Sequence, residues 1–283
     1  MNKIKKHFII CRRIIIFGSW LRLCVYIMCC VSWLITSSAN AATNEKPIWG
    51  FSIATGPYQP EMGKNKAYYR RIYAAKSNSS LFKHRPLMTT FTANWYILDT
   101  FGLLGLYGQF GYWKVSAPTR ICNATDPNDA TQTVVVACQP EDILARRSVE
   151  GTDQTELSIY PLSVGVNYKF DLLMREFALP LMPYTKGGID YFLWRNTTGG
   201  HVSYYHGKQG YGGTLGAQAA LGLMLNLDWI EPSAAKHARS STGVVASYIF
   251  FEARRLFADG FGNEKKLDLS ATHLQVGLAL DLN

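Results

Sequence analysis

The chain has few charged residues and, beyond its N-terminal region, no apolar run long enough to cross a bilayer as a helix. Charged residues make up 17% of the 283 positions, against roughly 25% in ordinary soluble domains. The hydrophobic share of 48% excludes disorder, and the 24 glycines lack the period of a collagen-like fibre. Aromatic residues reach 13%, including 16 Tyr and 14 Phe. This composition is typical of an all-β protein, and of a membrane β-barrel in particular.

The sequence also lacks the short motifs that mark common enzyme and metal sites. It contains no GxSxG, no P-loop, no HExxH and no CxxC. The net charge of +9 depends strongly on residues 1–41, which carry six basic and no acidic residues, so the remaining chain has a net charge of only +3. We therefore expect no nucleic-acid binding, no cofactor, no metal and no enzymatic activity.

Residues 1–41 are predicted to be a signal peptide. Basic residues precede an apolar stretch of 13 residues at 23–35, and Ala39-Asn40-Ala41 fits the small-x-small rule for cleavage. An uncleaved membrane anchor is the alternative, but a spanning helix needs about 20 apolar residues, and Arg22 interrupts the run. Residues 42–283 are then the exported domain.

Only two of the six cysteines, Cys122 and Cys138, lie outside the N-terminal segment. A pair of cysteines in an exported protein predicts a disulfide. Closing a loop of this size would contribute on the order of 3 kcal/mol by restricting the unfolded chain. No histidine lies nearby in the sequence, so a metal site is not expected.

Alternation of apolar with small or polar residues recurs along the exported domain. The clearest case is the C-terminal segment, where Leu or Val occupies every second position from Leu274 to Leu282. Seven more segments have strand-like patterns, at about 48–56, 87–98, 103–114, 155–170, 183–194, 212–225 and 243–254. Most are near or above the roughly 9–11 residues that a tilted membrane strand needs. The sequence thus predicts an all-β fold, an eight-stranded antiparallel up-and-down transmembrane β-barrel.

Two local features refine this prediction. The apolar phase changes at Pro161 within the segment 155–170, which predicts a one-residue bulge. Residues 228–240 predict a short helix that begins near Pro232.

The connections between the predicted strands differ in length. Only residues 99–102 join the second strand to the third, whereas the first connection has about 30 residues and the third covers about 115–154. Membrane barrels place long loops outside the cell and short turns in the periplasm. The pattern therefore predicts long extracellular loops, one short periplasmic helix and a location in the outer membrane of a Gram-negative cell.

Several stretches, taken in order, carry a family resemblance. They are Gly56-Pro57-Tyr58-Gln59-Pro60, Tyr160-Pro161-Leu162-Ser163, Tyr168-Lys169-Phe170-Asp171, the segment from Pro180 to Tyr191, the segment from Asp228 to Ala235, Gly243-Val244, and Phe250-Phe251-Glu252. The chain resembles a family of small outer-membrane β-barrel proteins of unassigned activity, best represented in myxobacteria and their relatives. The resemblance implies an outer-membrane up-and-down barrel and supplies no catalytic residues. The chain ends Leu282-Asn283 rather than on an aromatic residue, so the barrel insertion machinery would use an internal signal.

Charged residues lie on the predicted inner faces of two strands. Lys186 and Asp190 are four residues apart on one, and Glu252 and Arg254 are a similar pair on another. An eight-stranded barrel is just wide enough to be filled by its own side chains. We expect these residues to form an interior ion-pair network that closes the lumen. The alternative is a narrow channel for water or small ions, for which four inward glycines would leave space: Gly105, Gly111, Gly216 and Gly222.

His201 and Ser203 are the strongest candidates for a catalytic site. Their spacing resembles a His–Ser pair at a barrel rim, as in outer-membrane lipid A deacylases. A membrane-embedded lipid A-modifying hydrolase is therefore an alternative function. Such an enzyme also needs a carboxylate to orient the histidine, and none occurs between Asp190 and Asp228.

The first long loop combines basic residues with tyrosines. Lys64, Lys66, Arg70 and Arg71 lie among Tyr68, Tyr69 and Tyr73. On the outside of the cell these basic side chains would face lipopolysaccharide phosphates, although a merely solvated loop helix explains them equally well. The expected partners are outer-membrane lipid, lipopolysaccharide, the barrel insertion machinery and other envelope proteins.

The sequence favours a structural, adhesion or envelope-complex docking role for an integral outer-membrane barrel. A soluble lipocalin-like binder is a further alternative, because eight strands also build such barrels. That alternative requires the Leu-rich faces of the strands to point inward.

Overall fold

A computed structural model describes residues 46–63, 66–73, 86–99, 102–125, 133–138, 143, 149–177, 179–205, 208–263 and 266–283. The predicted signal peptide lies outside these ranges.

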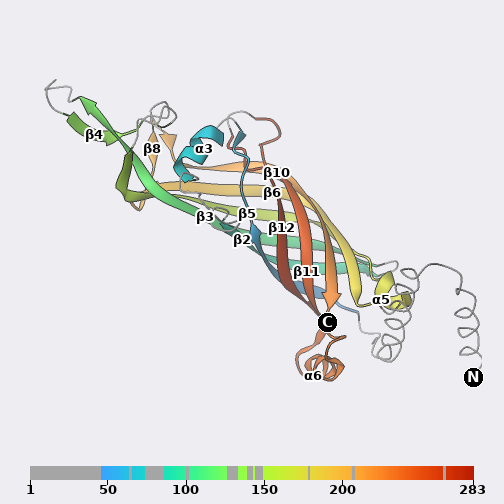
Figure 1. Cartoon of the computed structure of the whole chain (residues 1–283). Helices are drawn as coiled ribbons and strands as arrows, with labels where there is room; N and C mark the ends of the chain where they lie inside the picture. Colours follow the sequence, from blue (N-terminus) through green and yellow to red (C-terminus); the bar gives the residue numbers. More distant parts are fainter. Residues whose placement is uncertain are drawn as a thin grey trace, which may run out of the picture.

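Eight strands form a closed antiparallel barrel (Figure 1). They are β1 (Trp49–Pro57), β2 (Leu87–Asp99), β3 (Leu103–Thr125), β5 (Val149–Lys169), β6 (Leu181–Thr198), β10 (Tyr211–Asn226), β11 (Val244–Phe257) and β12 (Ala271–Leu282). Each strand pairs with its neighbour along the chain, and β1 pairs with β12, with Trp49 opposite Leu282, to close the ring. The predicted up-and-down barrel is confirmed.

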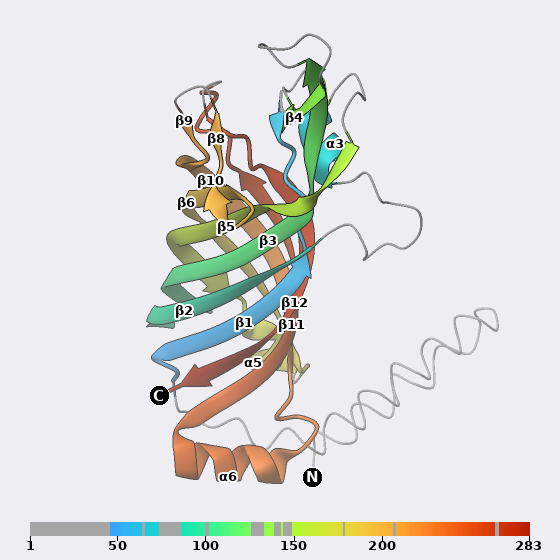
Figure 2. The ribbon, with the colours of Figure 1, turned by 90° about the vertical axis from the view of Figure 1, so that its left-hand side faces the viewer.

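The smaller elements gather at the two ends of the barrel (Figure 2). The long-loop end carries α3 (Lys66–Tyr73), β4 (Thr133–Ala137), β7 (His201–Val202), β8 (Tyr204–Tyr205) and β9 (Lys208–Gln209). The short-turn end carries α5 (Leu172–Phe177) and α6 (Pro232–Thr242). By the usual loop asymmetry, the first end is extracellular and the second periplasmic.

The predicted periplasmic helix corresponds to α6. Pro232 begins it, and Gly243, with a φ of 71°, ends it in the left-handed conformation that glycine adopts readily. The sequence did not predict α5, which is only six residues long. No helix in the described ranges has both the length and the apolarity needed to cross a bilayer.

The outer surface of the barrel is apolar and its interior is largely polar at mid-height. On β12, Leu274 is 68% exposed, whereas its neighbours His273 and Gln275 are buried. Because the Leu-rich faces point outward, the arrangement contradicts the soluble lipocalin-like alternative. Aromatic pairs mark the edges of the apolar belt, with Trp49 against Trp95 near the periplasmic end and Tyr112 against Tyr160 near the outer end.

The bulge predicted at Pro161 is wrong. The register of β5 with β6 runs without a shift, and Pro161 lies opposite Phe192. Leu157 and Ile159 point inward and are buried, whereas Leu162 points outward and is 42% exposed. The apolar phase changes because the lumen itself becomes apolar toward the outer end.

The long third connection is more ordered than the sequence predicted. β3 has 23 residues and β5 has 21, about twice the 9–11 residues that a membrane strand needs. The two strands stay paired out to Arg120 opposite Glu150 and Ile121 opposite Val149. Together with β4, which pairs with the end of β3, they form an outer sheet that extends beyond the barrel mouth (Figures 1 and 2).

Candidate functional site

The outer end of the lumen is closed by an apolar plug. It is built from inward side chains of six strands and from residues of the first and last loops that fold over the mouth. Its members are Tyr58, Met62, Tyr69, Met88, Trp113, Val115, Leu157, Ile159, Phe192, Leu256, Ala258, Leu269 and Ala271. We call this cluster the outer plug. Since Tyr69 belongs to α3, the plug also fixes that helix over the barrel.

Hydrogen bonds lock the centre of the outer plug. The Trp113 indole Nε1 donates to the carbonyl oxygens of Tyr58 and Pro86, at 3.2 and 3.0 Å. The Tyr58 hydroxyl donates to the carbonyl of Leu269 at 2.6 Å, and its ring meets that of Trp113 edge-on. Burial raises the pKa of Tyr58 well above its usual value, with neighbouring tyrosine and carboxyl groups adding to the effect. The phenol therefore stays protonated and keeps its hydrogen bond.

A network of charged and polar side chains crosses the lumen beneath the plug. Glu252 lies at its centre, where one carboxylate oxygen accepts from Arg254 and Gln275 and the other accepts from Tyr184 and Lys186. The N–O distance is 2.7 Å to Arg254 Nη2 and 3.1 Å to Lys186 Nζ. The network thus joins β6, β11 and β12.

The same network reaches the opposite wall of the barrel. Arg254 Nη2 donates to Gln109 Oε1 on β3 at 2.9 Å. Next to it, Gln218 Nε2 on β10 donates to the Tyr107 hydroxyl on β3 at 2.7 Å. These bonds join strands that are not neighbours in the sheet, so the side chains occupy the middle of the lumen.

A second ion pair lies nearer the periplasm. Lys169 Nζ contacts both carboxylate oxygens of Asp281 at 2.8 Å, and the Tyr96 hydroxyl donates to the same carboxylate. The Lys169 ammonium also lies over the rings of Tyr96 and Tyr248. The sequence did not predict this pair. Lys169 and Asp281 each place a charge on the polar face of a predicted strand, but nothing in the sequence indicates that the two residues pair.

A further apolar cluster lines the periplasmic end. This inner plug consists of Ala54, Met182, Tyr184, Met224, Ala246, Tyr248, Phe250 and Ala279, with Met174 of α5 packed against it. The buried charges of the described residues balance, with three cationic and three acidic side chains: Lys169, Lys186, Arg254, Asp190, Glu252 and Asp281.

The structure places all four predicted lumen residues inside the barrel and pairs Glu252 with Arg254 as predicted, but Lys186 and Asp190 do not pair with each other. Lys186 and Arg254 both contact Glu252. Asp190 is fully buried and lies opposite Ser163 in the register of β5 and β6. Within the described residues it forms no ion pair. The predicted Lys186–Asp190 pairing is therefore replaced by one across β6 and β11.

The inward glycines do not leave open space. A Cβ on Gly222 would clash with the Tyr184 ring, and one on Gly105 would lie 3.0 Å from Tyr96 Cδ1. A Cβ on Gly111 would meet Pro161, and one on Gly216 would meet the backbone of Phe257. These glycines instead accommodate the large side chains and close backbone approaches that fill the lumen.

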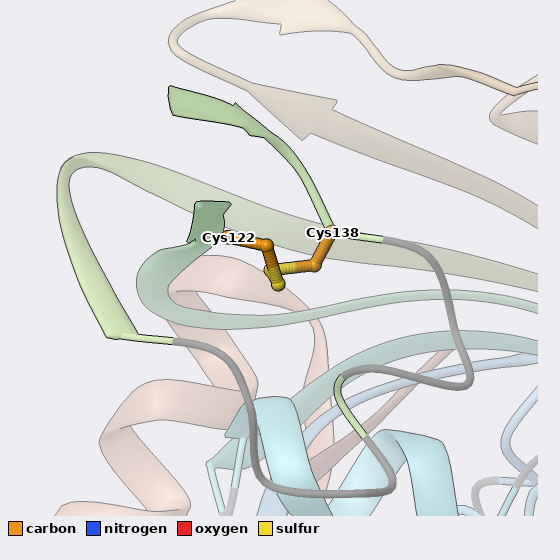
Figure 3. The surroundings of a disulfide bond; sticks show 2 residues. All are labelled: Cys122 and Cys138. Atoms are coloured by element: carbon orange, nitrogen blue, oxygen red, sulfur yellow. A yellow bond between two sulfur atoms is a disulfide. The ribbon is translucent and has the colours of Figure 1, made fainter. Parts of the chain in front are cut away.

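The outer sheet carries the predicted disulfide. Cys122 on β3 and Cys138, just after β4, are bonded with a Cα–Cα distance of 5.0 Å (Figure 3). Cys122 pairs with Val136 in the register of the two strands. The bond therefore ties β4 to the outer part of β3, next to the last pair that β3 forms with β5, Ile121 opposite Val149.

The basic residues predicted to contact lipopolysaccharide belong to this outer end. Lys66 and Arg70 of α3 are exposed, whereas Ile72 on another face of the helix is buried. Lys64 lies outside the described residues, and only the helical backbone of Arg71 is described. The predicted contact with lipopolysaccharide stays a prediction.

His201 and Ser203 do not form a hydrogen-bonded pair in the described part of the chain. The Ser203 hydroxyl bonds to that of Thr198 at 2.8 Å, and the His201 side chain is exposed. No described carboxylate forms a hydrogen bond with His201, and the described ranges contain no group of three or more His, Cys, Asp or Glu that could hold a metal ion.

A closed antiparallel barrel with an apolar belt, aromatic girdles and a polar lumen defines an integral outer-membrane β-barrel protein. The protein is thus located in the cell outer membrane.

Several solved outer-membrane barrels have a similar arrangement of strands. One is Neisserial surface protein A, at 11% identity and a TM-score of 0.40, with 83% of this chain and 97% of that one covered. Another is Ail, the attachment invasion locus protein of Yersinia pestis, at 8% identity and a TM-score of 0.36, with 84% and 99% covered. The outer membrane enzyme PagL has 10% identity and a TM-score of 0.36, with 82% and 99% covered.

Likenesses this weak carry no inference about activity. No family model matches the chain, and no curated protein does. The resemblance to the myxobacterial barrel family stays a prediction.

Proposed function

We propose that the protein is a closed outer-membrane scaffold, neither a channel nor an enzyme, that holds its outer sheet at the cell surface for adhesion or for docking another envelope protein. The observation that carries this proposal is the filling of the lumen. An apolar plug lies toward each end, and the lumen also holds three buried cationic and three buried acidic side chains among the described residues.

The filled lumen argues against a channel. A permeating ion would have to displace Arg254 or Lys186 from Glu252, and the side chains of these residues are at most 4% exposed. Breaking a buried pair leaves an uncompensated charge in a medium of low dielectric constant, at a cost of about 3–5 kcal/mol. The outer plug would then still bar the path.

The geometry at His201 argues against a hydrolase. Ser203 bonds to Thr198 rather than to a base, and a serine nucleophile needs a base that is itself oriented. The outer sheet, in contrast, is suited to present a binding surface outside the cell. Its strands β3 and β5 continue from the barrel, and a disulfide holds β4 against β3.

Two measurements test the proposal on the full chain purified from outer membranes. Folded protein, identified by its heat-dependent gel mobility, should give no unitary currents in planar bilayers. Steady unitary currents would contradict a closed scaffold. A variant in which a short turn replaces residues 119–150 should keep the mobility shift but lose cell adherence or its cross-linked envelope partner. If that variant keeps both interactions, display by the outer sheet is wrong.

A further inference from the structure

Outward side chains change from apolar to polar at one level on three neighbouring strands. On β3 the change falls between Tyr112 and Lys114, and on β5 between Tyr160 and Ser158. On β6 it falls between Leu193, which is 42% exposed, and the exposed Arg195. The paired rings of Tyr112 and Tyr160, 5.4 Å apart, form an aromatic row at the outer edge of the apolar belt. Lys114, Ser158 and Arg195 therefore lie at the boundary with the outer-leaflet head groups.

The strand register brings these three residues together. Lys114 pairs with Ser158, and Ser158 pairs with Arg195. Neighbouring strands are about 4.8 Å apart, so the backbones of the two cations are roughly 10 Å apart, with a serine between them. Both basic side chains are long enough to converge over Ser158, whose own side chain is small. Tyr211, 59% exposed, flanks Arg195 on the other side.

The charge at this boundary is only partly neutralised. Lys114 Nζ contacts Glu156 Oε1 at 2.8 Å. On another part of the rim, outward-facing Arg255 contacts Glu61 at 2.7 Å and also donates to Thr272. The guanidinium of Arg195, in contrast, forms no ion pair or side-chain hydrogen bond with any described residue. Among the described residues it is thus an exposed cation whose donors have no side-chain partner, and it lies beside a second cation.

We propose that Arg195, Lys114 and Ser158, together called the rim triad, bind a phosphate of lipid A, the membrane anchor of lipopolysaccharide. A guanidinium presents a planar fork of donors that fits two phosphate oxygens, the Lys114 ammonium adds a point charge, and the Ser158 hydroxyl adds a donor. The acyl chains of the same lipid would lie against the apolar belt directly below. This site lies on the membrane boundary and is separate from the basic face of α3.

Binding of lipid A to refolded full-length protein tests the rim triad. The probes are neutral phosphatidylcholine vesicles containing bis-phosphorylated lipid A, dephosphorylated lipid A or phosphatidylglycerol, and native mass spectrometry counts the retained lipid. Bis-phosphorylated lipid A should be retained, and Arg195→Gln should weaken its binding by about tenfold, the effect of losing one charged hydrogen-bonding partner. Lys114→Gln should have a smaller effect, because Glu156 already neutralises that ammonium. The matched control Arg255→Gln should bind as the unchanged protein does.

Three results would overturn the proposal. One is unchanged lipid A binding by an Arg195→Gln variant that retains the heat-dependent gel mobility. Another is equal retention of the dephosphorylated lipid. The third is equal retention of phosphatidylglycerol with the same dependence on Arg195, which would make an ordinary phospholipid the occupant.

Discussion

Ion pairs lie in two environments of this barrel, the buried lumen and the exposed outer rim. The buried pairs stabilise the fold, whereas the exposed pair is free to interact with other molecules. In the lumen, the side chains of Lys186, Glu252 and Arg254 are at most 4% exposed. At the outer rim, those of Lys114 and Glu156 are 39% and 34% exposed. Water can replace either partner at the rim but has little access to the lumen. The buried network therefore holds a single closed arrangement, whereas the rim pair can exchange its partners.

The largest expected effect comes from neutralising the centre of the buried network. Glu252→Gln leaves Lys186 and Arg254 without their shared counter-charge, and we expect a loss of about 3–5 kcal/mol in the free energy of unfolding. Urea unfolding in detergent or lipid, followed by the gel mobility shift, measures this loss. The matched rim variant Glu156→Gln should lose less than about 1 kcal/mol. Equal losses would remove the distinction between the two environments.

Removing the disulfide should strongly destabilise the outer sheet and leave the stability of the barrel unchanged. Cys122 and Cys138 are 16 residues apart, and opening a loop of that size costs about 3 kcal/mol in the chain-entropy account. Because the loop lies beyond the barrel, we expect Cys138→Ser to make this sheet susceptible to limited proteolysis while the urea midpoint of the barrel stays unchanged. A lower barrel midpoint would show that the outer sheet and the lumen unfold together.

The outer plug should be sensitive to the loss of the hydrogen-bond donor at its centre. Trp113→Phe removes the indole donor shared by the carbonyls of Tyr58 and Pro86, at an expected cost of about 1–3 kcal/mol. Since Tyr58 leads into the first loop, amide hydrogen exchange should rise near residues 58–63 and in α3. Exchange that rises only in the periplasmic inner plug would contradict this description of the outer mouth.

The sequence predicted the strands well because every membrane-spanning strand must present apolar side chains to lipid at alternate positions. The predicted segment 87–98 corresponds to β2, Leu87–Asp99, and 212–225 corresponds to β10, Tyr211–Asn226. Beyond the membrane that constraint disappears, and the sequence pattern predicts a loop where the outer parts of β3 and β5 lie. The false bulge at Pro161 has a related cause, since the prediction assumed one polarity for the whole lumen.

Partners across the lumen could not be predicted in the same way. Lys169 and Asp281 are 112 residues apart, and Arg254 and Gln109 are 145 residues apart. Only closure of the barrel and the stagger of its strands bring such pairs together. Alternation assigns a residue to the inner face but does not give its height in the lumen. This is why Lys186 was expected near Asp190 on its own strand rather than near Glu252.

Substitutions in α3 should have the smallest effect on the free energy of unfolding, in contrast to the large effect expected at Glu252. Lys66 and Arg70 are exposed, so replacing both with Gln should change the free energy of unfolding by less than about 0.5 kcal/mol per site. If these residues face lipopolysaccharide phosphates, the double variant should nevertheless bind isolated lipopolysaccharide more weakly, and the difference should shrink as salt is raised. Unchanged binding at low salt would leave α3 as a solvated cap on the outer plug. Lipid A lacks the core sugars and O-antigen, so loss of binding to lipopolysaccharide but not to lipid A would separate α3 from the rim triad.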